Sequence, residues 1–364
     1  MRRFFLLAIL LVSSVWAEGE REGDVIVIAP EQVAGGYEFF IENHGAEAYK
    51  VAVDVTLTNM NSDIPFPYTE VVPPQSRKRA FKLWRADSSQ ASGYKFTYKW
   101  RHAGSESRSC VRDLFCIITE MRGDSLFFSL DNQQLLPIAV KFIPTEFRNL
   151  ALNTPMPLVK TYAGHRRTEM FVAWLMDEWG DWKHGFKYQW QYGVAGAQHD
   201  DSYAYALPYA RGEKYIMVQG PNGEHSHQGK NAYDWEMPVG TRVHAAREGV
   251  VLAVIDSFTV SGDADYMKKE ANTIEILHPD GTIGRYSHLA NDGALVSTGE
   301  RIRRGQHLGW SGNTGYSTGP HLHFDVIRLT TDLEFDTIPV RFQVSCGRAS
   351  PLREGDAVEA FEKF

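Results

Sequence analysis

Short runs of β-branched and aromatic residues dominate the chain before Asp200, and they restrict this part to a β-rich fold. Such runs occur at residues 25–28, 50–58, 79–84 and 94–100, and Gly, Pro, Asn and Ser separate them. The first residue types favour strands and the second favour turns. We therefore predict a small β-sandwich here.

One aromatic pattern occurs twice along the chain. Gly93-Tyr-Lys-Phe-Thr-Tyr-Lys-Trp100 is matched by Gly185-Phe-Lys-Tyr-Gln-Trp-Gln-Tyr192, and an Ala-Gly pair follows each. Upstream, Phe39-Phe40 aligns with Phe127-Phe128. The repetition predicts two tandem β-sandwich modules, residues 22–108 and 120–200. The alternative is a chance similarity between aromatic strands.

The alternation within the first copy places Tyr94, Phe96, Tyr98 and Trp100 on one strand face. Such a row of aromatic side chains favours a packed core over its alternative, a carbohydrate-binding platform.

The first seventeen residues are typical of a secretory signal peptide. Arg2 and Arg3 precede an uncharged apolar run over residues 4–12, and Val15-Trp16-Ala17 supplies a cleavage site. The run is shorter than the ~20 residues that span a bilayer. We therefore expect cleavage after Ala17, export, and a mature protein without a membrane span.

Charge and cysteine content narrow the possible partners and the redox chemistry. The net charge is −7, which provides no general footprint for nucleic acid, so any polyanionic partner must be bound locally. Cys110 and Cys116 can close a small loop in an oxidising compartment, leaving Cys346 free, although the spacing alone does not establish the pairing.

From about Tyr203 the chain becomes richer in glycine turns. Residues 273–277, the turn His278-Pro-Asp-Gly281 and residues 282–288 predict a β-hairpin, and no long helical periodicity is present. We predict a third, mainly antiparallel β domain over residues 201–345, followed by a polar C-terminal tail over residues 346–364.

Histidine is concentrated in this third domain, where eight of the 13 histidines lie. His321 and His323 form an H-x-H pair, and on a strand residues i and i+2 point to the same face. His288 follows another predicted strand. The pair alone is a modest signal, because many structural strands contain one.

A second candidate group lies upstream, where His227 and Asp234 bracket a loop. An imidazole, a carboxylate and a second imidazole suit Zn²⁺ and leave a fourth position for water. His225 is an alternative first ligand. The sequence therefore predicts a catalytic rather than a closed structural zinc site.

Residues 226–326 resemble the lysostaphin-type (LytM-like) zinc metallopeptidases, which cleave peptide bonds in bacterial peptidoglycan. The resemblance rests on Ser226-His227 with Asp234, the run from Gly240 to Val251, Tyr286-Ser-His288-Leu, and Gly309-Trp-Ser-Gly-Asn-Thr-Gly-Tyr-Ser-Thr-Gly-Pro-His-Leu-His-Phe324. It covers about a third of the chain. The two modules ahead of it show only a general likeness to immunoglobulin-like domains.

The resemblance implies one Zn²⁺ per chain held by His227, Asp234 and His323, with His288 and His321 as catalytic histidines. Many relatives have H-x-x-x-D, whereas six residues separate His227 from Asp234 here, as in a longer known form. His321 is expected to be the general base, and His288 to donate to the oxyanion or share the proton transfer.

Other residues receive weaker predictions. His244, His278 and His307 are expected to have no catalytic part. The glycines Gly309, Gly312 and Gly315 lack the ending of a nucleotide-binding loop. They are expected to shape a wall of the substrate groove, with Asn313 and Tyr316 as substrate contacts.

Taken together, the sequence predicts a mainly β protein: two N-terminal immunoglobulin-like modules and an antiparallel-β lysostaphin-type peptidase domain. The predicted function is that of an exported zinc endopeptidase acting on peptidoglycan peptides. Its expected location is the periplasm if the cell has an outer membrane, and otherwise the protein is secreted or wall-associated. The alternatives are an inactive relative that binds and activates a wall amidase, a pure wall-binding protein, and an enzyme that cuts glycine-rich host proteins.

Overall fold

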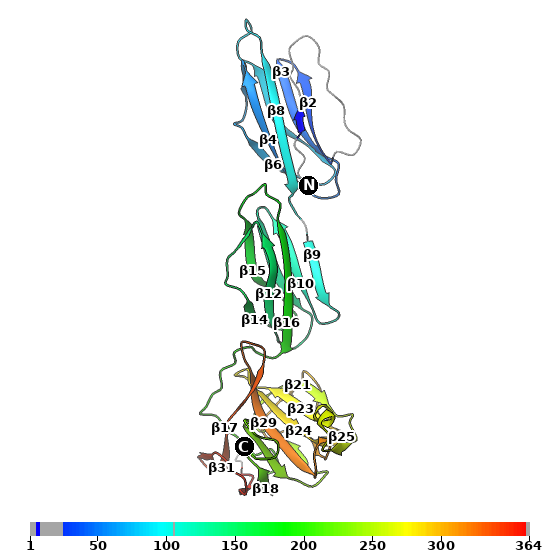
Figure 1. Ribbon diagram of the computed structural model, residues 1–364, viewed down its shortest axis with the longest axis vertical. Coiled ribbons are helices and arrows are strands. Elements are labelled where there is room, and N and C mark those ends of the chain that lie inside the picture. Colours follow the sequence, from blue (N-terminus) through cyan, green and yellow to red (C-terminus); the bar gives the residue numbers. More distant parts are fainter. Residues whose placement is uncertain (1–4, 8–24, 105, 362–364) are drawn as a thin grey trace.

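The structure, a computed structural model, describes residues 5–7, 25–104 and 106–361. Three bodies follow one another along the long axis, two sandwiches and a C-terminal domain (Figure 1). The predicted signal peptide lies outside the described residues except for β1 (Phe5–Leu7), which pairs with β8 (Gly93–His102). No helix in the described part is long and apolar enough to cross a membrane.

The first sandwich packs two antiparallel sheets around one apolar core, which contains Phe39, Val53 and Phe81. One sheet has the order β1-β8-β4-β6 and the other β2-β3-β7-β5. The remaining strands are β2 (Ile26–Val33), β3 (Gly36–Asn43), β4 (Tyr49–Thr58), β5 (Met60–Ser62), β6 (Tyr68–Val72) and β7 (Ser76–Arg85). Tyr94 is buried in this core and Phe96 packs against it, as expected for a structural aromatic row.

The second sandwich is built from the sheets β13-β15-β11-β10-β9 and β14-β12-β16. Its strands are β9 (Glu106–Val111), β10 (Phe115–Arg122), β11 (Ser125–Asn132), β12 (Ile138–Arg148), β13 (Leu150–Leu152), β14 (Leu158–Tyr162), β15 (Arg166–Leu175) and β16 (Lys183–Tyr192). Strands β9 and β10 belong to this body, which therefore starts ahead of residue 120. Cys110 and Cys116 face each other across the pair and form a disulfide, while Cys346 is free and exposed.

The two sandwiches repeat the same local chemistry. The Asn43 side chain donates to the carbonyls of Glu47 and Val72, and the Asn132 side chain donates to those of Leu136 and Tyr162.

The aromatic pairs correct the alignment of the repeat. Phe39 stacks on Phe81 in the first sandwich, and Phe128 stacks on Phe171 in the second. Phe39 is therefore equivalent to Phe128 rather than to Phe127, a shift of one residue from the sequence alignment. The reason is the alternation of strand faces: only a buried residue can be equivalent to a buried residue.

The C-terminal domain is built on a nine-stranded sheet with the order β26-β21-β23-β24-β29-β19-β18-β33, with β30 also paired to β29. Its strands are β18 (Lys214–Gln219), β19 (Ala232–Glu236), β21 (Gly249–Ile255), β23 (Thr273–Leu277), β24 (Ile283–Ser287), β26 (Arg301–Ile302), β29 (His321–Leu329), β30 (Phe335–Ile338) and β33 (Ala357–Glu359).

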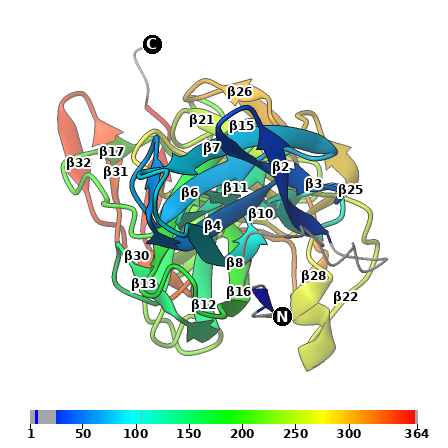
Figure 2. The ribbon, with the colours of Figure 1, turned by 90° about the horizontal axis from the view of Figure 1, so that it is seen from above.

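Smaller elements surround this sheet. They are β17 (Ala204–Tyr205), β20 (Arg242–His244), β22 (Ser261–Gly262), η1 (Asp265–Lys269), β25 (Leu289–Ala294), β27 (His307–Ser311), β28 (Gly315–Tyr316), β31 (Arg341–Ser345) and β32 (Arg348–Ser350). Seen along the long axis, the segment around β22 and β28 extends to one side (Figure 2).

The expected polar tail is wrong for most of residues 346–361. β32 pairs with β31, and β33 adds to the edge of the main sheet at β18. Leu352 and Ala360 are buried in the core of the domain. Val358 packs against the same core, so apolar contacts anchor this segment.

The second sandwich is joined to the C-terminal domain by apolar packing. Leu136 and Tyr192 pack with Leu252, Ile283 and Ile327. Because Leu136 is buried against the neighbouring body, we expect Leu136→Ala to loosen this junction.

Truncating a buried leucine typically costs about 2–5 kcal/mol. We predict a lower midpoint for the first unfolding transition and faster proteolysis between residues 193 and 203. Leu295→Ala, at a 55% exposed position, is the control. Equal behaviour of the two variants would show that the junction does not contribute to stability.

Candidate metal centre

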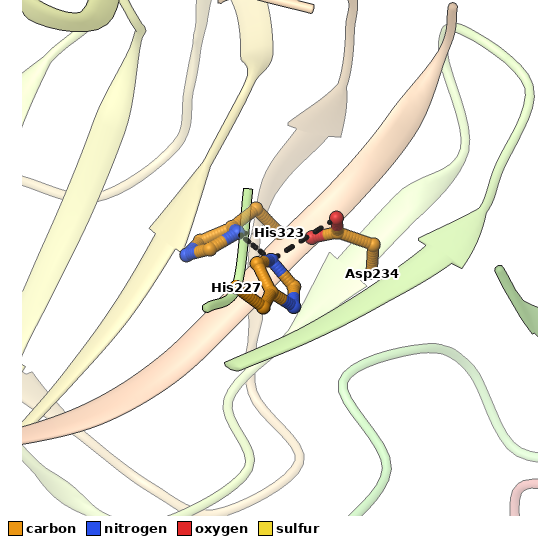
Figure 3. Close-up of side chains that lie close together, drawn as sticks. All are labelled: His227, Asp234 and His323. Atoms are coloured by element: carbon orange, nitrogen blue, oxygen red, sulfur yellow. Dashed lines mark hydrogen bonds and ion pairs between the residues drawn. The ribbon is translucent and has the colours of Figure 1, made fainter. Parts of the chain in front are cut away.

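Three side chains from distant parts of the sequence meet in the C-terminal domain: His227, Asp234 and His323 (Figure 3). His227 Nε2 lies 3.3 Å from His323 Nδ1 and 3.2 Å from an Asp234 oxygen. His323 Nδ1 lies 2.9 Å from the other Asp234 oxygen. His227 and Asp234 are buried, and the His323 side chain is 17% exposed.

Strand pairing brings two of the three together. Asp234 on β19 faces His323 on β29 directly across the sheet. His227 comes from the turn before β19, where its Nδ1 donates to the Gly220 carbonyl at 3.0 Å and leaves Nε2 as the free acceptor. The six residues between His227 and Asp234 therefore form a loop that returns both side chains to one point.

The separations fit a tetrahedral ion. Zinc bonds of about 2.0–2.1 Å place the ligand atoms of a tetrahedral site about 3.3 Å apart. The two imidazole nitrogens lie 3.3 Å apart, and each lies close to a different Asp234 oxygen: His323 Nδ1 is 2.9 Å from Oδ1 and His227 Nε2 is 3.2 Å from Oδ2. Two imidazole nitrogens and one carboxylate oxygen are also a donor set that suits Zn²⁺ and leaves one position open.

Gln219, at the end of β18, holds this arrangement, and sequence reasoning missed it. Its Nε2 donates to Asp234 Oδ2 at 2.9 Å, and its Oε1 accepts the backbone N–H groups of His225 and Ser226. One amide therefore orients the carboxylate and also anchors the turn that carries His227. Its only sequence signal is a polar residue at the end of an otherwise apolar strand.

A row of charged residues lies next to the three side chains on the same face of the sheet. Arg285 on β24 pairs with Asp325 on β29 through two hydrogen bonds of 2.9 and 2.6 Å, and Glu275 on β23 faces Arg285. An Asp325 oxygen lies 3.7 Å from His323 Nε2. Asp325 therefore places a carboxylate near the His323 nitrogen that does not contact Asp234.

The electrostatics favour a charged centre. Burial disfavours ionised Asp234, but hydrogen bonds with His227 and His323 outweigh it and hold the pKa of Asp234 well below its usual range. Burial also opposes protonation of His323, yet Asp234 and then Asp325 raise the pKa of His323 to about 9.

Two further imidazoles flank the three side chains. His321 Nε2 lies 3.9 Å from Asp234, and the His288 and His321 ring centroids are 4.5 Å apart. His321 Nδ1 lies 2.8 Å from the Gly319 carbonyl, and His288 Nδ1 lies 2.6 Å from that of Thr314. Each ring therefore uses Nδ1–H as a donor to the backbone and keeps Nε2 for chemistry.

His288 has an unusual setting. It lies between β24 and β25 with φ 63°, a left-handed conformation that is costly for a residue with a side chain. Burial, followed by the charges of His321 and His323, lowers the pKa of His288 to about 3. At neutral pH this imidazole is uncharged and its Nε2 is an acceptor.

The group opens into a cleft of about 640 Å³. His227, His288 and His323 line it, together with side chains of β23 and β24 and of the segments around residues 225–230 and 268–271. Tyr316 lines it as well, as expected. Asn313 instead bonds to Ser261 and Ser317 and is not among the lining residues.

The expectation for the glycine run is wrong. A Cβ on Gly312 would lie 2.6 Å from the backbone of Leu289 and Ala290, and one on Gly315 would lie 2.7 Å from Ala271. These glycines admit neighbouring segments of the protein itself, so their small size is required for folding rather than for substrate approach.

The remaining histidines lie elsewhere. His225 is exposed in the turn and lines the cleft, but it is not part of the three-residue group. His278 is buried and bonded to Thr282, and His244 packs against His307.

The all-β fold carries a side-chain group that could hold a metal ion. Residues 228–335 match the sequence model of peptidase family M23. The matched range contains Asp234, His288, His321 and His323 and starts one residue after His227.

Curated relatives match over the same region. The chain is 38% identical over 97 residues to the peptidoglycan DD-endopeptidase ShyA of Vibrio cholerae, which is 27% of this chain and 20% of ShyA. It is 35% identical over 161 residues to the glycyl-glycine endopeptidase ALE-1 of Staphylococcus capitis, 42% of this chain and 39% of ALE-1. The chain thus spans well under half of these relatives.

Among solved structures, the catalytic domain of lysostaphin from Staphylococcus simulans is 30% identical. The match covers 34% of this chain and 87% of that domain, with a TM-score of 0.26.

Removing the Gln219 amide tests whether it orients Asp234 and the turn that carries His227. We expect Gln219→Ala to weaken Zn²⁺ affinity by about 10–100-fold, the usual effect of losing a partner that orients a ligand. Chelator competition measures this affinity. Gln228→Ala, exposed in the same turn, is the control and should bind zinc like the parent. Equal zinc affinities of the two folded variants would show that Gln219 does not orient the ligands.

The raised pKa of His323 predicts proton release on metal binding. A metal ligand must be deprotonated, so Zn²⁺ must displace the His323 proton at any pH below about 9. We expect about one proton released from this site per zinc at pH 7, and an apparent affinity that falls about tenfold per pH unit on acidification. Calorimetry in buffers of different ionisation enthalpy measures the release, and a buffer-independent enthalpy would contradict it.

Proposed function

We propose that this protein is a zinc-dependent endopeptidase that hydrolyses peptide bonds in bacterial peptidoglycan. In this proposal His227, Asp234 and His323 hold one Zn²⁺ per chain, and His288 and His321 carry out the proton transfers. One observation carries the proposal: His227, Asp234 and His323 bring ligand atoms within 4.8 Å of one another at a cleft that His227 and His323 line, beside two more imidazoles.

The names of the relatives support the substrate class. ShyA is named as a peptidoglycan DD-endopeptidase, and ALE-1 as a glycyl-glycine endopeptidase. For this chain we accordingly propose action on peptidoglycan peptides outside the cytoplasm, with the periplasm as the expected site if the cell has an outer membrane.

The chain's own residues account for positioning and proton transfer. When bound, Zn²⁺ polarises a carbonyl and lowers the pKa of a water towards about 7. In this proposal His321, whose Nε2 is 3.9 Å from Asp234, takes the proton of the attacking water and then returns it to the leaving amine. His288 offers a second Nε2 and, once protonated, a donor for the oxyanion.

Two roles are expected for His288, donation to the oxyanion or a share in the proton transfer, and its geometry bears on both. Its Nδ1 lies 2.6 Å from the Thr314 carbonyl, so the N–H of the neutral ring donates there. His288 can donate to an oxyanion from Nε2 only after it has gained a proton.

Digestion of purified peptidoglycan by residues 18–364 tests the proposal, with mass analysis of released fragments. We expect fragments from the parent protein, and none from a chelated sample or from His323→Ala, which loses zinc. His321→Ala should keep its zinc and lose about 10²–10⁴-fold in rate. His307→Ala, which alters a histidine that packs against His244 away from the cleft, is the matched control with parental activity.

The inactive-regulator alternative predicts a different outcome. If the parent protein binds one Zn²⁺ per chain but releases no fragments, the endopeptidase proposal is wrong. Stimulation of a wall amidase by the same sample would then support the regulator.

A further inference from the structure

The cleft is cationic although the protein is acidic. Four side chains with positive charge line it: Lys230, Lys268, Lys269 and Arg285. Glu275 is the one carboxylate among the lining residues, whereas the whole chain has a net charge of −7. A local excess of positive charge on a protein that is negative as a whole favours an anionic ligand at this cleft.

Neighbouring carboxylates balance the positive charge of Arg285. Arg285 makes two hydrogen bonds to Asp325, and Glu275 is its neighbour on the adjacent strand. The remaining positive charge of the cleft is that of its three lysines.

The lysines come from two different segments that line the cleft. Lys230 belongs to the turn after His227, and Lys268 and Lys269 belong to η1, in the segment that extends to one side in Figure 2. Among the described residues no carboxylate forms an ion pair with Lys230 or Lys269.

Within residues 25–104 and 106–361, the one ion pair of Lys268 is with Asp265, whose side chain is 91% exposed, and such pairs contribute little. The Lys268 ammonium also lies 5.2 Å from the centre of the Tyr316 ring, which keeps it at the cleft.

We propose that these three lysines select a substrate peptide that bears free carboxylates, rather than a neutral glycine-rich peptide. The inference rests on the proposed endopeptidase function and names its substrate class. A peptide lying along the floor would pass between Lys230 and the η1 lysines, so carboxylates on either side of the scissile bond would meet a cation. An oligoglycine peptide has no side-chain carboxylate that could pair with these lysines.

The test compares three substrates: a cross-linked muropeptide with free carboxylates, the same muropeptide with its carboxylates converted to amides, and pentaglycine. Amidation removes charge while leaving the bond to be cut. We expect kcat/KM for the free-carboxylate form to exceed that for the amidated form by about tenfold. This difference would come from several exposed ion pairs between substrate carboxylates and the lysines, each of modest strength. The ratio should shrink at high salt, because exposed charges are screened.

The matched variants are Lys268→Gln with Lys269→Gln, Lys230→Gln, and the control Lys214→Gln on β18, outside the cleft. Each cleft variant should lower the rate on the free-carboxylate substrate by about 2–5-fold per lysine and leave the amidated substrate unchanged. The control should retain the parental preference.

Binding to zinc-loaded His321→Ala gives a readout that does not need turnover. Tighter binding of the free-carboxylate muropeptide, lost in the lysine variants, is the expected result. Equal binding and equal rates for the two muropeptides, or preference for pentaglycine, would overturn this inference while leaving the endopeptidase proposal intact. Selective binding without cleavage by the parent would support the lysine inference and overturn the endopeptidase proposal.

Discussion

The register of β29 against its two neighbours is the constraint on which the whole C-terminal domain depends. His323 faces Asp234 on β19 and Ser287 on β24, and both pairings fix the same face of the sheet. Side chains alternate with period two, so a slip of one residue would turn His323 into the core and Phe324 into the cleft. Phe324 is fully buried, and its burial on the opposite face keeps the histidine where it is.

From this register three rows of side chains follow along one sheet face. The first contains Ser287, His323 and Asp234, and the second contains Glu275, Arg285 and Asp325. The third contains Leu277, Ile283 and Ile327 and is covered by the second sandwich. At about 3.4 Å per residue, successive rows are about 7 Å apart. A single sheet face thus supports the candidate metal centre, an ionic row and the junction between domains.

The part of the site that the sequence could predict is the part encoded by local spacing. The H-x-H pair follows strand alternation, and the histidine and aspartate that bracket a loop were recognisable without knowing their neighbours. Gln219 and the partnership of Arg285 with Asp325 were missed, because they depend on which strands pair, and β18, β24 and β29 are far apart in sequence. The same holds for Leu352 and Ala360, which look like part of a polar tail until their contacts are known.

The ionic row separates two surfaces with opposite requirements. The junction row is apolar and excludes water, whereas the candidate metal centre must admit water and a peptide. Arg285 and Asp325 satisfy each other at the boundary, so neither leaves an unpaired charge beside Ile327, and Asp325 still reaches the His323 ring. Arg285 and Asp325 therefore lie between the junction and the candidate metal centre, and their mutual pairing lets an apolar surface and a polar one share one sheet face.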